Sequence, residues 1–218
     1  MSYKPGKHNK ELFYLLSRSF VRLISSAGMG CKPSTFMILF KTLRALGVAS
    51  SRTLLDQMID TVFMEEVGKE IASLFKDNMP TKILTIEASG IGIAVAAGTI
   101  MKIPVLVAKK SLTSNVSKDV YTTTIHSFTH NTDNQVIVSR EYLGGKDKIL
   151  IIDDFLANGC ALEGLIKIVE EAGASLIGCC VAIEKGFQHG GDLLREKGYR
   201  IESLAIIDEM DENRILFR

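Results

Sequence analysis

The sequence predicts an α/β fold with a mostly parallel, doubly wound sheet and helices on both faces. Strand-like and helix-like segments alternate between residues 80 and 207, the pattern of consecutive β–α–β units. Residues 148–153 form an almost continuous apolar run, as in a central strand that is covered on both faces. A chain of 218 residues can bury roughly 70% of its unfolded surface, which suffices for one domain with a real core.

The helices are predicted from apolar residues at helical spacing and from turn residues at their ends. In residues 53–77 the apolar positions recur every three or four residues. An alanine-rich helix follows Ser89 and Gly90 and runs to about residue 101. Two more helices are expected over residues 159–172 and 188–197, and Gly173 suits the C-cap of the first of them.

The strands are predicted from short apolar or alternating runs that end in turn residues. They comprise residues 82–87, 104–108, 120–128, 136–139, 148–153, 175–183 and 201–207. Because helices separate most of them, we expect parallel neighbours joined by crossover connections.

Charge is distributed unevenly along the chain. Residues 1–52 hold nine Lys and Arg and one acid, Glu11, for a charge of +8, and the net charge of +1 leaves −7 for the rest. These residues also lack the β/α rhythm. We therefore expect a basic N-terminal segment of residues 1–52 before a globular domain of residues 53–218.

The cysteines show no metal-binding spacing. Cys179 and Cys180 are adjacent in an apolar run and are interpreted as buried thiols, which favours a reducing, cytoplasmic setting. No stretch reaches the roughly 18 apolar residues that a membrane span needs.

The stretch ILIIDDFLANGCALEGL, residues 149–165, carries the main functional signal. Asp153 and Asp154 stand at the end of a predicted strand, where ligands of open α/β sheets bind. A loop of small residues then enters a helix, and a helix N-terminus favours phosphate. Carboxylates can accept hydrogen bonds from sugar hydroxyls, so the pattern predicts a ribose phosphate site. A plain strand–turn–helix with a solvated acid pair is the alternative.

The same stretch resembles the phosphoribosyl-pyrophosphate signature of type I phosphoribosyltransferases. Further motifs in matching order are similar to those of the bacterial xanthine phosphoribosyltransferases: LTIEASGI at residues 84–91, IEK at 183–185 and KGYRIESLA at 197–205. The resemblance implies the type I phosphoribosyltransferase fold, with a small hood and a mobile lid over residues 111–119. It also implies a homodimer and Mg²⁺ bound mainly through the phosphoribosyl pyrophosphate.

The resemblance assigns roles to matching residues. It places the 5-phosphate on the loop of Ala157, Asn158, Gly159, Cys160 and Ala161, and the ribose hydroxyls on the catalytic pair, Asp153 and Asp154. The pyrophosphate would be bound by Ala88, Ser89, Gly90, Lys109 and Lys110. The two lysines suit that anionic leaving group, although the alternative is a solvated pair.

The resemblance implies a purine site around Lys185, with Phe187 as a stacking partner or a core residue. An asparagine of the family contacts the purine, and its position here is Asp56. In the hypoxanthine–guanine branch, an aspartate near the purine N7 stands where this chain has Ala157. Xanthine is itself acidic near neutral pH, so catalysis would rest on positioning and charge stabilisation.

Two functions from different classes follow. The first is an enzyme of purine salvage that transfers phosphoribosyl to a 6-oxopurine, xanthine by resemblance, without a membrane or nucleic-acid partner. The second is a purine-responsive DNA-binding repressor that uses the same fold to bind an effector. The +8 charge of residues 1–52 fits the repressor, whereas the loop LANGCA resembles the enzymes.

Overall fold

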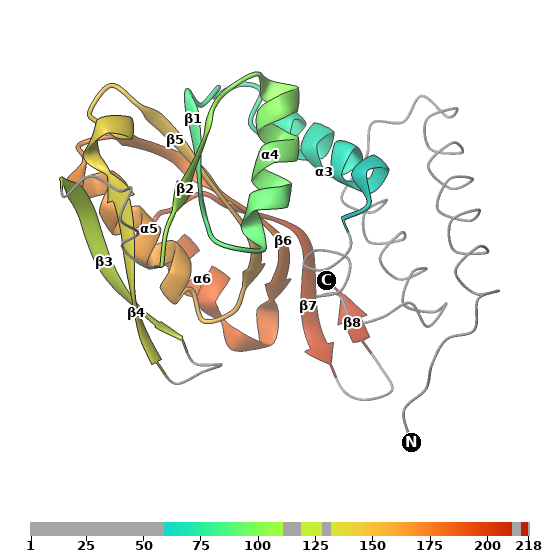
Figure 1. Cartoon of the computed structure of the whole chain (residues 1–218). Coiled ribbons are helices and arrows are strands. Elements are labelled where there is room, and N and C mark those ends of the chain that lie inside the picture. The colour runs from blue at the N-terminus through green and yellow to red at the C-terminus, as the bar shows by residue number, and fades with distance from the viewer. Residues whose placement is uncertain (1–58, 111–118, 128–131, 211–214, 218) are drawn as a thin grey trace.

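The structure is a computed structural model that describes residues 59–110, 119–127, 132–210 and 215–217. Its main sheet has six strands in the order β2-β1-β5-β6-β7-β8 (Figure 1). All neighbours are parallel except β7 and β8. The strands are β1 (Lys82–Ile86), β2 (Val105–Ala108), β5 (Lys148–Leu156), β6 (Ser175–Lys185), β7 (Ile201–Met210) and β8 (Ile215–Phe217).

Helices cover both faces of this sheet, as the sequence predicts. One face packs against α3 (Thr61–Leu74) and α4 (Gly90–Met101), and the other against α5 (Cys160–Glu171) and α6 (Gly190–Glu196). The second face is also covered by an antiparallel hairpin of β3 (Val120–Ser127) and β4 (Thr132–Ser139). Short 3₁₀ turns occur at η2 (Arg140–Tyr142) and η3 (Gly186–Gln188).

Strand β5 shows why its sequence is continuously apolar. Leu150 and Ile152 belong to the core beneath α3 and α4, whereas Ile149 and Ile151 belong to the core beneath α5. Successive side chains of a strand point to opposite faces, so a strand covered on both sides needs apolar residues at every position. The prediction of a buried central strand is confirmed, and Cys179 and Cys180 are buried in the neighbouring β6.

The chain order of the sheet reverses between β1 and β5. From β1 the chain crosses through α4 to β2 on one side, and from β5 it proceeds to β6 and β7 on the other. Such a switch point leaves a crevice beyond the carboxyl ends of the two strands, where ligands of doubly wound folds bind.

Several element boundaries differ from the prediction. Helix α3 begins at Thr61 rather than residue 53, because Asp60 is extended and caps it by accepting hydrogen bonds from the N–H groups of Val62 (3.0 Å) and Phe63 (3.1 Å). Strand β5 continues past residue 153 to Leu156 because the long strand β6 supplies a partner, Glu184, for that last residue.

Other differences concern one helix and two strands. The predicted helix 188–197 is the turn η3 followed by α6, and the two are separated by His189, whose φ is 59°. Strand β8 was not predicted, and strand β4 begins at Thr132 rather than residue 136. The basic segment 1–52 and most of the lid, residues 111–118, lie outside the described residues.

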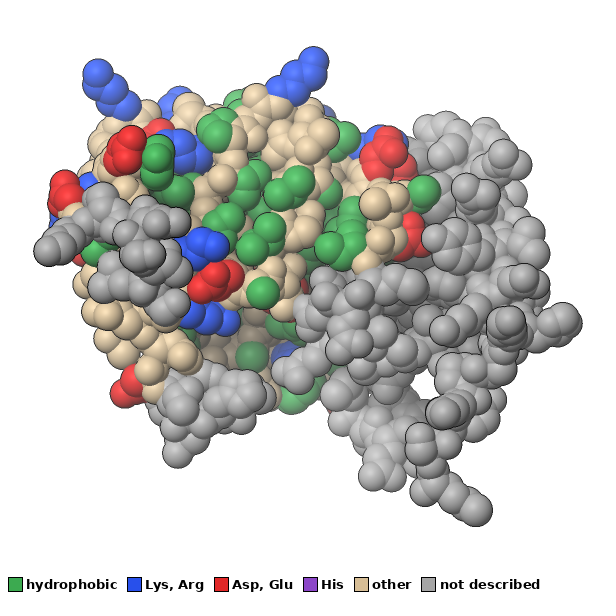
Figure 2. Space-filling model, in the orientation of Figure 1, with side chains coloured by type: hydrophobic (Ala, Val, Ile, Leu, Met, Phe, Trp, Pro, Cys, Tyr) green, Lys and Arg blue, Asp and Glu red, His purple; other side chains and the backbone are tan. Residues whose placement is uncertain are grey.

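Hydrophobic side chains reach the surface over α4 and the adjoining end of α3 (Figure 2). They include Ile59, Val62 and Val95, with 49%, 42% and 50% of their surface exposed. Within the described part of the chain, no helix is long and apolar enough to cross a membrane.

Candidate active site

A cleft of about 620 Å³ lies at the switch point of the sheet. Most of the residues singled out in the sequence meet there: Ala88, Ser89, Lys110, Asp153, Asp154, Ala157, Asn158, Cys160, Ala161 and Lys185. They come from the ends of four parallel strands, because each of these strands delivers its following loop to the same edge of the sheet.

The acid pair lies near the carboxyl end of β5. Asp153 is only 5% exposed and its Oδ1 accepts a hydrogen bond from the N–H of Asp154 (3.0 Å). Burial, followed by the neighbouring charge of Asp154, raises the pKa of Asp153 well above its usual value. Asp154 is half-buried and lines the same cleft. The pair therefore presents oxygen acceptors in a partly dry site.

The loop after β5 is shaped to receive an anion. Gly159 is the N-cap of α5, and its φ of 90° is a left-handed conformation that favours glycine. Glycine offers no side chain to cap the helix, so first-turn N–H groups are left for a ligand or water. The N–H of Cys160 is an exception, because it donates to Oδ1 of Asn158 (3.4 Å). This arrangement suits a phosphate at the start of α5.

Gly90 does not line the cleft but packs behind it. A Cβ at this position would lie 2.5 Å from the Thr85 hydroxyl and 2.9 Å from Oδ1 of Asp153. Glycine thus lets the start of α4 approach the acid pair closely, a packing role that differs from the pyrophosphate contact that the resemblance implies for Gly90. The Glu87–Ala88 peptide that precedes it is cis.

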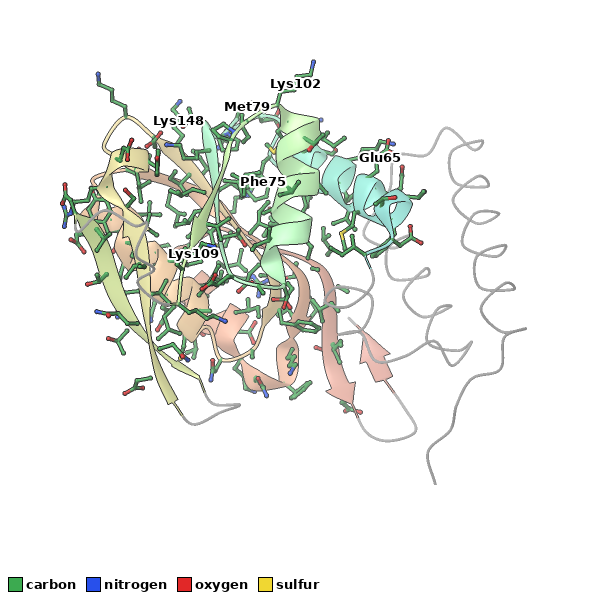
Figure 3. The ribbon with its side chains drawn as sticks, viewed as in Figure 1. Glu65, Phe75, Met79, Lys102, Lys109 and Lys148 are labelled. Atoms are coloured by element: carbon green, nitrogen blue, oxygen red, sulfur yellow. The ribbon has the colours of Figure 1, made fainter. Side chains whose placement is uncertain are left out.

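The two lysines after β2 occupy different environments. Lys109 lies just beyond the strand (Figure 3), where its ammonium is 3.3 Å from the carboxylate of Glu87. Lys110 lines the cleft. Its backbone N–H donates to Glu87 (2.6 Å), and this hydrogen bond lowers the pKa of Glu87. Glu87 therefore ties the loop after β1 to the end of β2 and neutralises one of the two lysines.

The proposed purine side of the cleft is formed by the end of β6. Lys185 lines the cleft, with its ammonium 5.8 Å from the centre of the Phe155 ring. Phe187 is 40% exposed and is absent from the lining of the cleft. Asp56 lies outside the described residues.

Sequence reasoning missed several lining residues, namely Ile86, Glu87, Ile125, Asn134, Val136 and Gln188. Glu87 sits inside the quoted LTIEASGI motif, so its adjacency to Ser89 was a usable signal. Asn134 and Val136 come from the β3–β4 hairpin, which is held to the main chain at Lys109: Lys109 and Ile137 exchange backbone hydrogen bonds of 3.0 and 2.9 Å. No local pattern in the hairpin shows where it will fold.

The donor atoms at the cleft fit Mg²⁺ only with help from a ligand. Asp153 and Asp154 supply hard carboxylate oxygens, which Mg²⁺ prefers. No group of three or more His, Cys, Asp or Glu residues that could hold a metal occurs among the described residues. Two carboxylates and several missing ligands match a cation that is held largely by substrate phosphates.

The acid pair lies beside a loop that opens a helix, an arrangement that suits a ribose phosphate. Comparison with known proteins shows which family the chain belongs to. The profile of the phosphoribosyl transferase domain matches residues 58–212. The chain therefore belongs to the phosphoribosyltransferase family, a family of enzymes.

Its curated relatives include xanthine phosphoribosyltransferases from several bacteria. The protein of that name from Lachnoclostridium phytofermentans is 49% identical over 75% of this chain and 86% of its own length. Xanthine phosphoribosyltransferase 1 of Clostridium perfringens is 48% identical, with 75% and 87% covered. The protein from Ruminiclostridium cellulolyticum is 50% identical, with 75% and 86% covered.

Solved structures show the same fold. Adenine phosphoribosyltransferase from Giardia lamblia, in complex with 9-deazaadenine, has a TM-score of 0.62 at 23% identity and covers 72% of this chain and 84% of its own. The adenine phosphoribosyltransferase of Leishmania donovani also has a TM-score of 0.62, at 15% identity, with 74% and 71% covered. At these identities the likeness concerns the fold alone.

Proposed function

We propose that the protein transfers the 5-phosphoribosyl group from phosphoribosyl pyrophosphate to xanthine, giving xanthosine monophosphate and pyrophosphate in purine salvage. The observation that carries this proposal is the 48–50% identity to xanthine phosphoribosyltransferases over 75% of the chain. The cleft at the switch point supports it, because the acid pair, the loop that opens α5 and Lys110 all line that cleft.

In this proposal the 5-phosphate binds at the start of α5. The backbone of residues 157–161 surrounds it, and the partial positive charge of the helix N-terminus stabilises it. Asp153 and Asp154 accept hydrogen bonds from the ribose hydroxyls. When bound with the donor, Mg²⁺ neutralises negative charge on the pyrophosphate. The two carboxylates are the residues that would contact it beside the ribose.

The leaving pyrophosphate would lie between Ala88–Ser89 and the end of β2. The ammonium of Lys110 stabilises the charge that develops as the C1–O bond breaks. Burial raises the pKa of Asp153 in the free protein. A sugar that becomes cationic at the transition state has the opposite effect on this carboxyl, because a neighbouring positive charge favours its ionised form. Positioning and charge stabilisation then account for the rate, without a protein base at Ala157.

The purine would lie at the end of β6, where Lys185 donates to an oxo group. Asp56 and Phe187 remain proposed contacts from the resemblance. The lid of residues 111–119 would exclude water, which otherwise captures the sugar. We also propose that the protein is cytoplasmic and that it forms a homodimer. Size-exclusion chromatography with light scattering tests the homodimer.

A turnover assay tests the proposed function. Purified protein is mixed with phosphoribosyl pyrophosphate and Mg²⁺ and offered xanthine, hypoxanthine, guanine or adenine, and the nucleotide is identified by mass spectrometry. Xanthosine monophosphate should form with the highest kcat/KM. No turnover of any purine would contradict the proposal. The comparisons give no support to the DNA-binding repressor, and all three curated relatives are named as enzymes.

A further inference from the structure

An ion pair between a buried carboxylate and an arginine side chain that is 32% exposed lies behind the cleft. Glu184, on β6 next to Lys185, has 1% of its side chain exposed. Its carboxylate accepts two hydrogen bonds from Arg195, at 2.9 Å from Nη1 and 2.6 Å from Nη2. The hydroxyl of Ser203 donates to the same carboxylate. The two parallel hydrogen bonds fix orientation as well as distance, unlike a contact between point charges.

Through this pair, Arg195 fastens α6 to two strands. Its guanidinium binds Glu184 on β6, and its Nε donates to the carbonyl oxygen of Ile201 on β7 (3.3 Å). A Cβ on Gly191, in the first turn of α6, would collide with Oε1 of Glu184. Since α6 has only 7 residues, it has little stability of its own and depends on such contacts for its place.

Helix α6 in turn supports the loop that begins α5. A Cβ at Gly190 would collide with the carbonyl oxygen of Ala157 and lie 2.6 Å from the nitrogen of Gly159. A Cβ at Gly159 would lie 3.5 Å from Leu194, which is 1% exposed. Backbone therefore rests on backbone, and a shift of α6 must move the loop.

We infer that Glu184 and Arg195 are positioning residues, which set the geometry of the phosphate loop 157–161 by holding α6 against it. The inference rests on the proposed function, which assigns this loop to the 5-phosphate. Neither side chain lines the cleft. They act through Gly190, which packs against the loop, and they would thereby hold the loop in its phosphate-binding geometry before the ligand binds.

The variant must separate a positioning role of the pair from a purely structural one. Removing Arg195 alone leaves a buried carboxylate and destabilises the fold, so a loss of stability would be mixed with a loss of phosphate binding. The double variant Glu184→Leu with Arg195→Met avoids this problem, because replacing a buried ion pair by apolar side chains is often neutral or stabilising. It removes the directional hydrogen bonds and keeps the volume.

The experiment compares the wild type and this double variant in three measurements. Calorimetry gives the affinity for ribose 5-phosphate, kinetics give the separate KM values for donor and xanthine, and hydrogen exchange of the free protein reports on amides 158–161. We expect about ten- to hundredfold weaker ribose 5-phosphate binding and a similar rise in the donor KM, as a displaced binding group produces. The KM for xanthine should change less, and the loop amides should exchange faster.

Two single variants serve as references. Arg195→Lys keeps the charge without the bidentate geometry and should restore part of the affinity. Arg200→Met removes a more exposed ion pair near the same strands, to Glu202 at 2.8 Å, together with a hydrogen bond to the carbonyl oxygen of Leu74. It should lower the melting temperature without changing ribose 5-phosphate affinity.

A folded double variant with wild-type loop exchange would overturn the inference, as would wild-type ribose 5-phosphate affinity. Failure of the proposed function looks different: the wild type itself would show no turnover and no ribose 5-phosphate binding. Hydrogen exchange at the loop needs neither ligand nor activity, so it decides the positioning role even in that case.

Discussion

Asp153 is held where its ionised form is disfavoured. Its carboxyl is 5% exposed and has the charge of Asp154 beside it, and both raise its pKa. Asp153→Asn should weaken donor use about tenfold or more, because a hydrogen bond from a ribose hydroxyl to a charged acceptor contributes about 1.5–3 kcal/mol. Steady-state kinetics with varied donor measure this loss, and Asp154→Asn should also reduce kcat/KM for the donor.

The same substitution should not destabilise the protein. Because the pKa of Asp153 is raised on folding, the folded state binds the extra proton, and stability falls as the pH rises from the usual aspartate value to the raised one. That loss remains above the raised value. Asp153→Asn removes this component, so its melting temperature should gain on the wild type as the pH increases. Melts between pH 4 and pH 8 that run parallel for both proteins would argue against a raised pKa.

The lysines after β2 should contribute unequally. Lys109 is paired with Glu87 and 45% of its side chain is exposed, whereas Lys110 lines the cleft. Lys110→Ala should therefore raise the KM for donor, and the inhibition constant for pyrophosphate, more than Lys109→Ala does. Product inhibition measured on both variants checks this order. Equal effects would mean that Lys109 leaves Glu87 when the donor binds.

Lys185 should determine the preference for 6-oxopurines. An ammonium donates to an oxo group but repels the hydrogens of an amino group, so adenine is disfavoured. Lys185→Ala should reduce kcat/KM for xanthine about ten- to hundredfold, the expected cost of one charge-assisted hydrogen bond. Ribose 5-phosphate affinity should stay at the wild-type value. A flat response of xanthine use would remove Lys185 from the purine site.

Among the elements, the turn from β5 into α5 depends on the backbone conformation of one glycine. Gly159 has φ of 90°, which a β-branched residue rarely adopts. Gly159→Val should abolish ribose 5-phosphate binding and lower stability by about 1–2 kcal/mol through strain. Calorimetry and chemical denaturation measure the two effects. Gly144→Ala is the matched control, since a Cβ there meets nothing within 4 Å. Binding by the valine variant would exclude the loop as the phosphate site.

Strand β5 and its loop could be predicted because their signals are local. The run from Ile149 to Ile152 is apolar at every position since both faces are covered, and the acid pair and Gly159 follow directly along the chain. The order of elements then brings their neighbours together, because carboxyl ends of parallel strands share one edge. The main part of the cleft was predictable for this reason.

The remaining parts of the cleft depend on contacts between distant segments. Glu87 forms an ion pair with the ammonium of Lys109, whereas it accepts a hydrogen bond only from the backbone N–H of Lys110. This difference depends on the loop geometry, which the periodicity of the sequence does not predict. The hairpin contributes Asn134 because it folds across α5, where a Cβ on Gly164 would lie 2.6 Å from Cγ1 of Ile125. Gly190 resembles an ordinary turn residue in the sequence, and only the packed structure shows the loop resting on it.

At the scale of the whole molecule, function is concentrated in one part of the chain. The family match covers residues 58–212, and the cleft is built from residues 86–188. The order of the strands along the chain reverses between β1 and β5, so the cleft lies in the middle of the sheet rather than at an edge. Residues 1–52 precede all of these elements. They carry the positive charge of +8, which the rest of the chain offsets with −7.

The proposed boundary at residue 52 predicts that the rest of the chain works without the basic segment. A chain of residues 53–218 should keep its melting temperature, its ribose 5-phosphate affinity and its KM for donor, since none of the described site residues precedes Ala88 apart from Ile86 and Glu87. Its charge would fall from +1 to −7, so any salt-dependent binding of the full chain to DNA should disappear. The truncated chain should also keep its selectivity for xanthine, because it retains Asp56. Loss of folding or donor binding on truncation would show that the basic segment belongs to the enzyme domain.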